Sequence, residues 1–472
     1  MSRVQAWILV AALAVSGSLA LGQAVSANSA PASQPAAAPA ALPPPPAAQV
    51  DPVEQWIQQS KNPTSWLKWG ADVRLREHWT NNDRTLNEDA ANHEWHYQRA
   101  RQRLWLTGTP CPDLEINARL VWEFYNYCWP NTSNRRDFNV DEAMFDILNV
   151  KWKSPFGLPA TVTVGRQELM FGDGWLVLDG TPLDGSRTIS FDAARITYDL
   201  KDIKTTADIV YINQTSREDR WIEPFNHQAQ TRFTSENDEQ GVILWVANKS
   251  LEKTEIDGFF IWKHDEKQLS TGDNADIYAF GPRVVHNFND NWRYTGQFAI
   301  EAGEKNDANI CAFGTVNDLT YSFHDPKNNR LRTQFEYLSG DTNQDKGFDI
   351  LWGRWPQWSE ILANTWALET RPAQYTNLYR VGWGWALNPS DKTEFSLNYN
   401  LFFANQNPKA GTAGFSDNAK FRGQLLTALL TYKFNPHVSG HLLGEVFAPG
   451  NYYDDFRNDV ALFLRYEVVF TW

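Results

Sequence analysis

Strict alternation of apolar and polar residues runs through almost the whole chain after residue 66, and it constrains the fold more than any other feature. At the end of the chain, apolar side chains occupy every second position from Leu462 to Trp472, with Arg465 and Glu467 between them. Successive side chains of a β-strand point to opposite faces, so such a segment is a strand with one wholly apolar face. Helical periodicity is almost absent from the same region. The sequence therefore predicts an all-β protein.

About 18 such segments can be counted, most of them about 9–13 residues long, the length that a tilted strand needs to cross a bilayer. Their approximate starts are residues 70, 96, 113, 141, 160, 191, 206, 239, 255, 275, 291, 316, 330, 376, 392, 420, 437 and 459. Connections after even-numbered segments are short and rich in Asn, Pro, Gly and Asp, whereas those after odd-numbered segments are mostly long. Short periplasmic turns and long external loops are typical of outer-membrane barrels. We predict an antiparallel transmembrane β-barrel over residues 66–472, in the outer membrane of a Gram-negative-type cell.

Composition excludes two other classes of protein. The mean hydropathy is −0.50, and there is no apolar run of 18 residues, which argues against a helical membrane protein. The net charge of −13 comes without basic blocks and argues against a nucleic-acid partner. The 22 Trp residues favour a protein that seeks an interface, or one that binds carbohydrate.

The N-terminal region has the pattern of an exported protein. Residues 1–22 resemble a signal peptide, with Arg3 as the positive start, an apolar stretch from Trp7 to Val15, and small residues after it. Residues 23–65 form an Ala/Pro-rich periplasmic leader of extended character, with one short helix expected at 53–61. The leader either spans the periplasm or touches periplasmic export partners.

The cysteines argue against a metal site and against redox chemistry, and we expect no cofactor. Cys111, Cys128 and Cys311 lie far apart and form no paired motif. We expect Cys111 in a periplasmic turn, and Cys128 and Cys311 in the outer loops 125–140 and 302–315, where they either pair or remain free.

No catalytic motif stands out, and we expect no enzyme activity. The residues Asp341, Asn343 and Asp345 resemble the opening of a calcium-binding loop, but Gly347 comes one place late and Trp352 stands where a glutamate is needed. Calcium binding is therefore disfavoured here, and Asp273, Asn274 and Asp276 are predicted to form an ordinary polar loop.

Arginine gathers on the polar faces of neighbouring strands. The barrel must close by pairing its last strand with its first, which brings together seven arginines: Arg74, Arg76, Arg99, Arg101, Arg103, Arg119 and Arg465. Guanidinium groups stay charged and bind carboxylate bidentately, so these seven could attract an anionic solute. The alternative is that they pair with carboxylates such as Glu115, Glu123 and Glu467 and only brace the barrel.

Four stretches resemble the bacterial alginate export family. They are Val164–Leu169 with Phe171–Gly174; Arg187 with Phe191–Tyr198; Glu336–Asp341 with Phe348–Asp349; and Phe447–Tyr453 leading to Leu462–Arg465. The resemblance covers residues 66–472. It implies an 18-stranded barrel with an arginine-rich pore through which a uronate polymer leaves the cell.

The same resemblance adds Arg166 and Arg195 to the candidate pore lining. Arg195 shares a strand face with Thr197, as a lumenal residue should. Strict alternation places Arg166 with Val162 and Val164, so a bulge at Gly165 or a position beyond the apolar band is required.

Two functions remain open. The first is a passive outer-membrane channel for anionic saccharides or polysaccharide, gated by the outer loops 214–238 and 339–375. The second is a plugged, non-transporting barrel with a structural or adhesive role. The tryptophans of the second loop either stack on sugar faces or fold the loop into the barrel mouth: Trp352, Trp355, Trp358 and Trp366. In both cases the outer face contacts membrane lipid and lipopolysaccharide.

Overall fold

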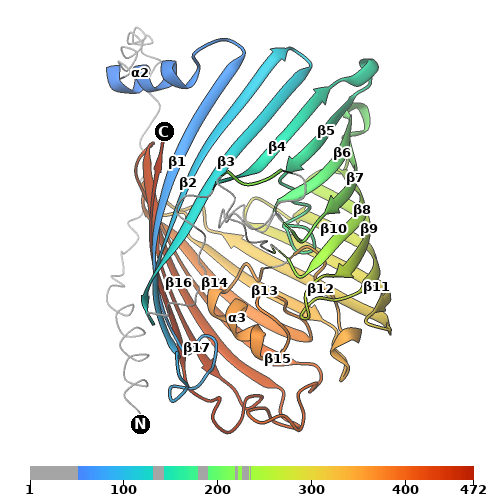
Figure 1. Ribbon diagram of the computed structural model, residues 1–472, viewed down its shortest axis with the longest axis vertical. Coiled ribbons are helices and arrows are strands. Elements are labelled where there is room, and N and C mark those ends of the chain that lie inside the picture. The colour runs from blue at the N-terminus through green and yellow to red at the C-terminus, as the bar shows by residue number, and fades with distance from the viewer. Residues whose placement is uncertain are drawn as a thin grey trace, which may run out of the picture. The chain divides into compact units, whose positions relative to one another are not determined.

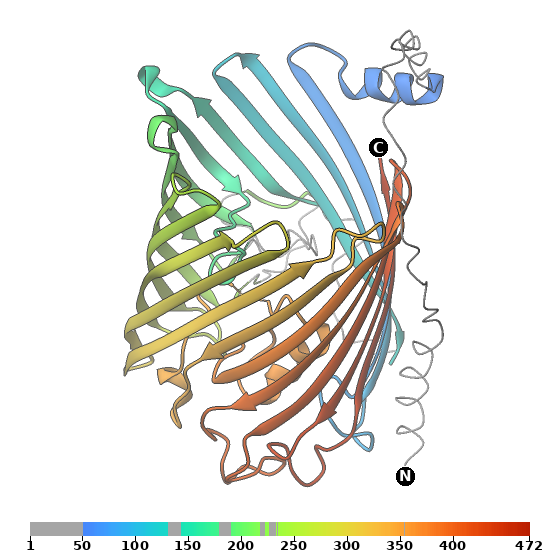
Figure 2. The same ribbon diagram turned by 180° about the vertical axis from the view of Figure 1, so that it is seen from behind.

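The computed structural model describes residues 51–130, 143–178, 190–217, 222–225, 233, 235–353 and 355–472. The predicted signal peptide, the leader up to residue 50 and Arg187 lie outside these residues, as does part of the predicted gate 214–238. Within the described part of the chain, one antiparallel sheet of 18 strands closes into a barrel (Figures 1 and 2).

Each strand pairs with its neighbours along the chain, and β1 pairs with β18 to complete the ring. The strands are β1 (Leu67–Asn81), β2 (Glu94–Cys111), β3 (Leu114–Trp129), β4 (Met144–Lys153), β5 (Ala160–Gln167), β6 (Phe191–Leu200), β7 (Thr205–Gln214), β8 (Asn237–Asn248), β9 (Thr254–Lys267), β10 (Ala275–Asn287), β11 (Trp292–Lys305), β12 (Ala308–Ser322), β13 (Arg330–Leu338), β14 (Leu378–Ser390), β15 (Thr393–Ala404), β16 (Phe421–Asn435), β17 (Val438–Pro449) and β18 (Ala461–Thr471). The predicted antiparallel barrel is confirmed.

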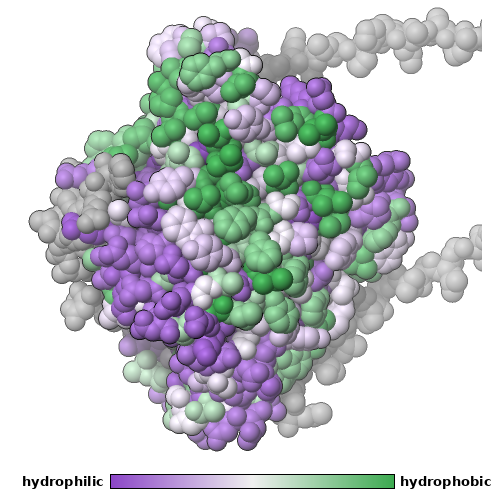
Figure 3. Space-filling model, turned by 90° about the vertical axis from the view of Figure 1, so that its right-hand side faces the viewer, coloured by the Kyte–Doolittle hydropathy of each residue, from purple (hydrophilic) through white to green (hydrophobic). Residues whose placement is uncertain are grey.

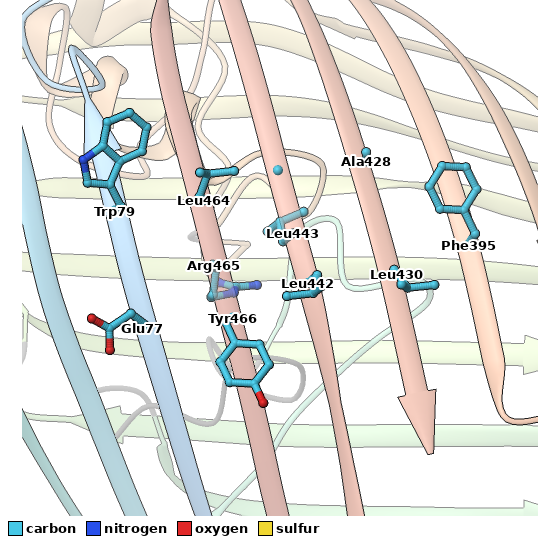
Figure 4. Close-up of a pocket in the computed structure, with 11 residues that line it drawn as sticks. Glu77, Trp79, Phe395, Ala428, Leu430, Leu442, Leu443, Leu464, Arg465 and Tyr466 are labelled. Atoms are coloured by element: carbon cyan, nitrogen blue, oxygen red, sulfur yellow. The ribbon is translucent and has the colours of Figure 1, made fainter. Parts of the chain in front are cut away.

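The outer face of the barrel is apolar. On β7, Ile209 and Tyr211 are 45% and 46% exposed, whereas Val210 between them is fully buried. Figure 3 shows hydrophobic residues gathered over the centre of one side of the barrel, with hydrophilic residues below them. Another part of the outer face, over β15–β18 and β1, carries an apolar groove whose lining includes Leu464 and Tyr466 (Figure 4). An outward apolar band of this kind faces lipid in outer-membrane barrels.

Two α-helices accompany the strands in the described chain. Helix α2 (Pro52–Lys61) covers the position where a short helix was expected, and the carbonyl of its Ser60 accepts a hydrogen bond of 2.7 Å from Trp69 Nε1. Helix α3 (Glu360–Thr365) belongs to the segment between β13 and β14 and lies inside the ring of strands (Figures 1 and 2). No helix among the described residues is long and apolar enough to cross a bilayer.

The connections only partly follow the predicted alternation of lengths. In the described chain the turns after even-numbered strands have two to seven residues, as expected. The predicted outer loop 302–315 is wrong, because β11 and β12 are joined by Asn306 and Asp307 alone. Both residues have positive φ, 49° and 64°, which suits a tight hairpin turn and which Asn and Asp tolerate. Strand β12 therefore begins at Ala308 rather than near 316.

The expected positions of the cysteines also need correction. Cys111 is the last residue of β2, and Cys128 and Cys311 lie within β3 and β12 rather than in outer loops. The strands β3 and β12 stand on opposite sides of the ring. All three thiols are exposed and unpaired, so the disulfide left open by the sequence does not form.

Candidate functional site

The seven arginines predicted to converge lie on the inward face of four adjacent strands, β18, β1, β2 and β3. The strand register places Arg74 opposite Arg101 and Arg76 opposite Arg99. We call this group the arginine wall; its members are Arg74, Arg76, Arg99, Arg101, Arg103, Arg119 and Arg465.

Carboxylates stand between the guanidinium groups on β1, β2 and β3. Asp72 accepts hydrogen bonds from Arg101 Nη2 at 3.1 Å and from Arg103 Nη2 at 2.5 Å. Glu123, which is fully buried, pairs with Arg99. Of the bracing contacts anticipated from the sequence, that of Glu123 is present, whereas Glu115 pairs with Lys151 and Lys153 instead of an arginine. Asp72, which was not anticipated, serves two arginines.

The same sharing occurs at the seam of the barrel. Glu467 of β18 pairs with Arg76, and its Oε2 lies 3.9 Å from Arg74 Nε. Arg465 Nη1 lies 2.6 Å from Oε1 of Glu360, at the start of α3. One arginine of the wall is thus held by a residue of the segment that enters the barrel.

Arg119 and Arg195 make separate pairs on the inward face. Arg119 Nη2 lies 2.9 Å from Asp146 Oδ2 and also contacts Glu168. Arg195 Nε donates to Asp208 Oδ1 at 2.8 Å. Arg195 lies on β6 and is not part of the arginine wall.

Arg166 lies at the outer end of β5. The register passes through Gly165 without a shift, although this glycine has a φ of +116°, and Arg166 is the penultimate residue of the strand. Its guanidinium holds Asp192 bidentately, at 2.8 and 2.9 Å, and donates to the carbonyl of Phe145. The sequence analysis required either a bulge at Gly165 or a position of Arg166 beyond the apolar band. The unbroken register favours the second, with Arg166 at the end of the strand.

Burial divides the candidate residues. Within the set of nine, the most exposed side chains are those of Arg195 at 28% and Arg103 at 20%. Arg74 and Arg76 are each 2% exposed at the side chain. Among the nine candidates, Arg195 and Arg103 are therefore the guanidinium groups most accessible from the lumen.

The segment 339–377 between β13 and β14 folds into the barrel, and we call it the inward loop. Trp352 and Trp366 are 0% and 2% exposed. Trp352 Nε1 donates to Glu239 of β8, and Trp358 Nε1 donates to Glu336 of β13, both at 3.1 Å. The sequence analysis considered two roles for these tryptophans, stacking on sugars and folding the loop into the barrel. In the structure the loop folds into the barrel.

The barrel wall facing the inward loop is apolar on its inner side. Ile212, Ile243, Ile261 and Ile277, on β7 to β10, are all fully buried and belong to the same cluster as Trp352. A second segment joins them from the β5–β6 connection, where the carbonyl of Leu176 accepts a hydrogen bond of 3.0 Å from Trp352 N. The two inward segments thus support each other across the lumen.

Buried ion pairs hold the inward loop to the wall. Arg422 of β16 binds Glu369 through Nε at 2.9 Å and Nη2 at 2.5 Å, and both side chains are at most 3% exposed. The hydroxyl groups of Tyr452 and Tyr453 donate to the same carboxylate, at 3.0 and 3.2 Å. Glu369 therefore has four hydrogen bonds that are made only when the loop is inside the barrel.

Two further contacts fasten other parts of the inward loop to strands of the barrel. Lys305 Nζ of β11 lies 2.9 Å from Asp349 Oδ2. Burial opposes the ionisation of Asp349, but the ammonium group of Lys305 outweighs it and holds the pKa of Asp349 below its usual range. Glu445 of β17 accepts hydrogen bonds from the backbone of Glu360 and Ile361, at 3.0 and 2.9 Å.

Reasoning from the sequence missed these anchors. The barrel strands supply four of the side chains that hold the inward loop, and each lies at an inward-facing position of its strand: Lys305, Glu336, Arg422 and Glu445. A charged residue at such a position was visible in the sequence, but the loop residue that would meet it was not.

The segment from Asp341 to Asp345, which resembles the opening of a calcium-binding loop, uses its side-chain oxygens in hydrogen bonds to the protein. Asp341 Oδ1 accepts from the backbone of Asn343 at 2.9 Å, and Asn343 Oδ1 accepts from Asp345 at 3.1 Å. Asp345 Oδ1 accepts from Asn306 at 3.0 Å. Two of these oxygens accept hydrogen bonds from within the segment and the third accepts one from the β11–β12 turn.

Comparisons with known proteins agree with this architecture. The family model described as "Alginate export" matches residues 65–462. No curated protein matches the sequence. Solved structures from Pseudomonas aeruginosa share the fold: OccK7 (OpdD), at 10% identity, covers 87% of this chain and 99% of its own with a TM-score of 0.54. OccK9 (OpdG), also at 10% identity, covers 85% and 98% with a TM-score of 0.55. The outer membrane protein OpdK, at 9% identity, covers 86% and 99% with a TM-score of 0.52.

The family model spans nearly the whole barrel, from the residue before Trp66 to Leu462 in β18. The closed ring and its apolar outer face are those of an outer-membrane β-barrel. The chain is an outer-membrane β-barrel and belongs to the alginate export family.

Proposed function

We propose that this protein is a passive outer-membrane channel for anionic saccharides, with a uronate polymer as the preferred class of solute. The observation that carries the proposal is the arginine wall, seven guanidinium groups on four adjacent strands. Guanidinium is weakly hydrated and matches the geometry of a carboxylate, so it suits repeated contact with a polyanion. The description of the matched family, alginate export, supports the same class of solute.

Sharing of carboxylates favours transport over tight binding. Asp72 is shared by Arg101 and Arg103, so a solute carboxylate can replace one of two contacts without leaving Asp72 unpaired. Contacts formed by exchange are weak in net free energy, because each new ion pair replaces an existing one. A solute that binds weakly at several positions can also leave, as conduction requires.

The second candidate is a plugged barrel with a structural or adhesive role. The observation in its favour is the inward loop, whose Trp352 and Trp366 are buried among apolar residues of the wall. The channel should conduct ions, whereas the plugged barrel should not.

Single-channel conductance and reversal potential under a salt gradient test the proposal, with the refolded barrel in a planar bilayer. We expect an anion-selective pore that added oligouronate blocks. Selectivity falls when Arg103, the most exposed member of the arginine wall, is replaced by Gln. It falls further when Arg195, the most exposed of the nine candidates, is replaced as well. A cation-selective pore refutes the proposal, and a barrel without conductance favours the plugged alternative.

Two control variants separate charge from fold. Arg103→Lys keeps the positive charge but loses the guanidinium fork, so it should retain anion selectivity and weaken block by oligouronate. Replacing Arg330 and Arg332 by Gln removes two inward charges from β13, away from the arginine wall. If this pair changes selectivity as much as Arg103→Gln alone does, the arginine wall has no special role.

A further inference from the structure

Three metal-ligating side chains converge on the outer face of the barrel, away from the lumen. Glu77 lies on β1, His96 on β2 and Cys128 on β3. A carboxylate oxygen, a ring nitrogen and the Sγ atom lie within 4.8 Å of one another. The His96 ring is in direct contact with Glu77, and the Cys128 thiol is exposed.

The cluster lies where the apolar band of the outer face ends. Along β1, β2 and β3, one cross-strand row holds Leu75, Ala100 and Phe124, and the next row outward holds Glu77, Gln98 and Asn126. Cys128 and His96 follow one step further, beside the exposed Trp129. Aromatic residues mark the membrane interface in such barrels, so the three ligands stand at the level of the lipid headgroups and are reached from water.

The identity of the ligands selects a class of metal. One thiolate, one imidazole and one carboxylate suit zinc and similar borderline ions, whereas calcium and magnesium take oxygen ligands. Bond lengths of about 2.0–2.3 Å require ligand atoms closer together than 4.8 Å, which side-chain rotations can supply. Three protein ligands leave a fourth position for water or an anion.

We propose that Glu77, His96 and Cys128 form a binding site for a zinc-class divalent cation that links β1, β2 and β3 at the outer rim. Metal binding replaces the contact between His96 and Glu77 and adds a third ligand from a third strand. The inward faces of the same three strands carry most of the arginine wall, so the metal holds those strands together next to the solute path.

Cobalt(II) substitution tests the site in the full refolded barrel kept under reducing conditions. We expect one equivalent of Co²⁺ to bind and to give a thiolate-to-cobalt charge-transfer band, which added Zn²⁺ removes. Cys128→Ser abolishes the band, and His96→Gln weakens Co²⁺ binding at least tenfold. The matched controls are Cys111→Ser and Cys311→Ser, which remove exposed thiols outside the cluster and should leave the band unchanged.

A second measurement is independent of the spectrum. Because a ligand that binds only the folded state stabilises it, Zn²⁺ should raise the midpoint of thermal unfolding of the wild type and of both control variants, but not of Cys128→Ser. The absence of a thiolate band in the wild type, or its persistence in Cys128→Ser, overturns the proposal. If Cys128→Ser does not fold, His96→Gln decides, and an unchanged affinity in that variant also overturns it.

Discussion

Replacing Arg422 by Met should release the inward loop and open the barrel. The guanidinium of Arg422 makes two hydrogen bonds to Glu369 and two more, of 2.7 and 3.3 Å, to the carbonyls of Asn377 and Phe403. Methionine preserves much of the side-chain volume but makes none of these bonds. The variant leaves the Glu369 carboxylate buried with only the hydroxyl groups of Tyr452 and Tyr453 as partners.

The size of the effect follows from burial. Side-chain exposure is 2% for Arg422 and 3% for Glu369, so the pair lies in the range where removing one partner costs about 3–5 kcal/mol. The displaced loop exposes Glu369 to water and avoids this cost. The ratio of displaced to inward loop therefore rises by about 100-fold to about 4,000-fold, at about 1.4 kcal/mol for each factor of ten.

Single-channel recording measures this directly. We expect the Arg422→Met barrel to show larger and noisier conductance than the wild type, because the inward loop now leaves the lumen for part of the time. The double variant Arg422→Met with Glu369→Leu is the matched control, since it removes both charges and leaves no buried carboxylate unpaired. The double variant should return toward wild-type conductance.

One result refutes the reasoning. If Arg422→Met lowers the stability of the barrel by several kcal/mol while its conductance and current noise remain those of the wild type, the inward loop is not the element that limits flow. The constriction must then be sought in the second inward segment, from Leu169 to Leu178.

Three further outcomes are expected. Glu360→Gln should raise anion selectivity, because it removes the loop carboxylate held by Arg465 at 2.6 Å; reversal potentials test this. Trp352→Ala should raise conductance and lower stability by about 3–5 kcal/mol, as expected for a buried Trp truncated to Ala; unfolding by denaturant measures the second effect. The contact of α2 with the barrel should depend on pH, because the hydrogen bond to Glu54 raises the pKa of His437. A raised histidine pKa gives a stabilisation that is full below the ordinary value of about 6.5 and is lost as the pH rises through the raised value. Limited proteolysis of α2 across that range should show faster cleavage at the alkaline end, and an unchanged rate contradicts the assignment.

The barrel could be predicted from the sequence because its outer face must be apolar along every strand. Strand starts agree closely with the structure where the inner face is polar, as on β1 and β18. The clear failure is β12, whose first residues include Ile310 and Ala312 on the inner face. These residues line the apolar cluster around the inward loop, so both faces of β12 are apolar there and the alternation fades.

The inward loop itself could not be predicted, for a related reason. The alternation of apolar and polar residues predicts which strand residues face inward, but it does not predict which loop covers them. A signal was nevertheless present: Ile209, Val210, Tyr211 and Ile212 are all apolar, so the inner face of β7 could not face water. Strands that lose their polar face while their neighbours keep one indicate that something apolar fills the lumen at that point.

The arginine wall and the inward loop are linked through α3. Glu360, which opens α3, binds Arg465 of the wall, and the backbone of the same first turn is held by Glu445 of β17. A carboxylate of a polyanionic solute that competes for Arg465 has to displace Glu360, which loosens one end of α3. Burial raises the pKa of Glu360, but Arg465 outweighs it and keeps the net pKa below its usual value, so the competition takes place between two charged carboxylates at neutral pH. Under the proposed function, entry of solute and displacement of the loop therefore favour each other, since both use the same arginine.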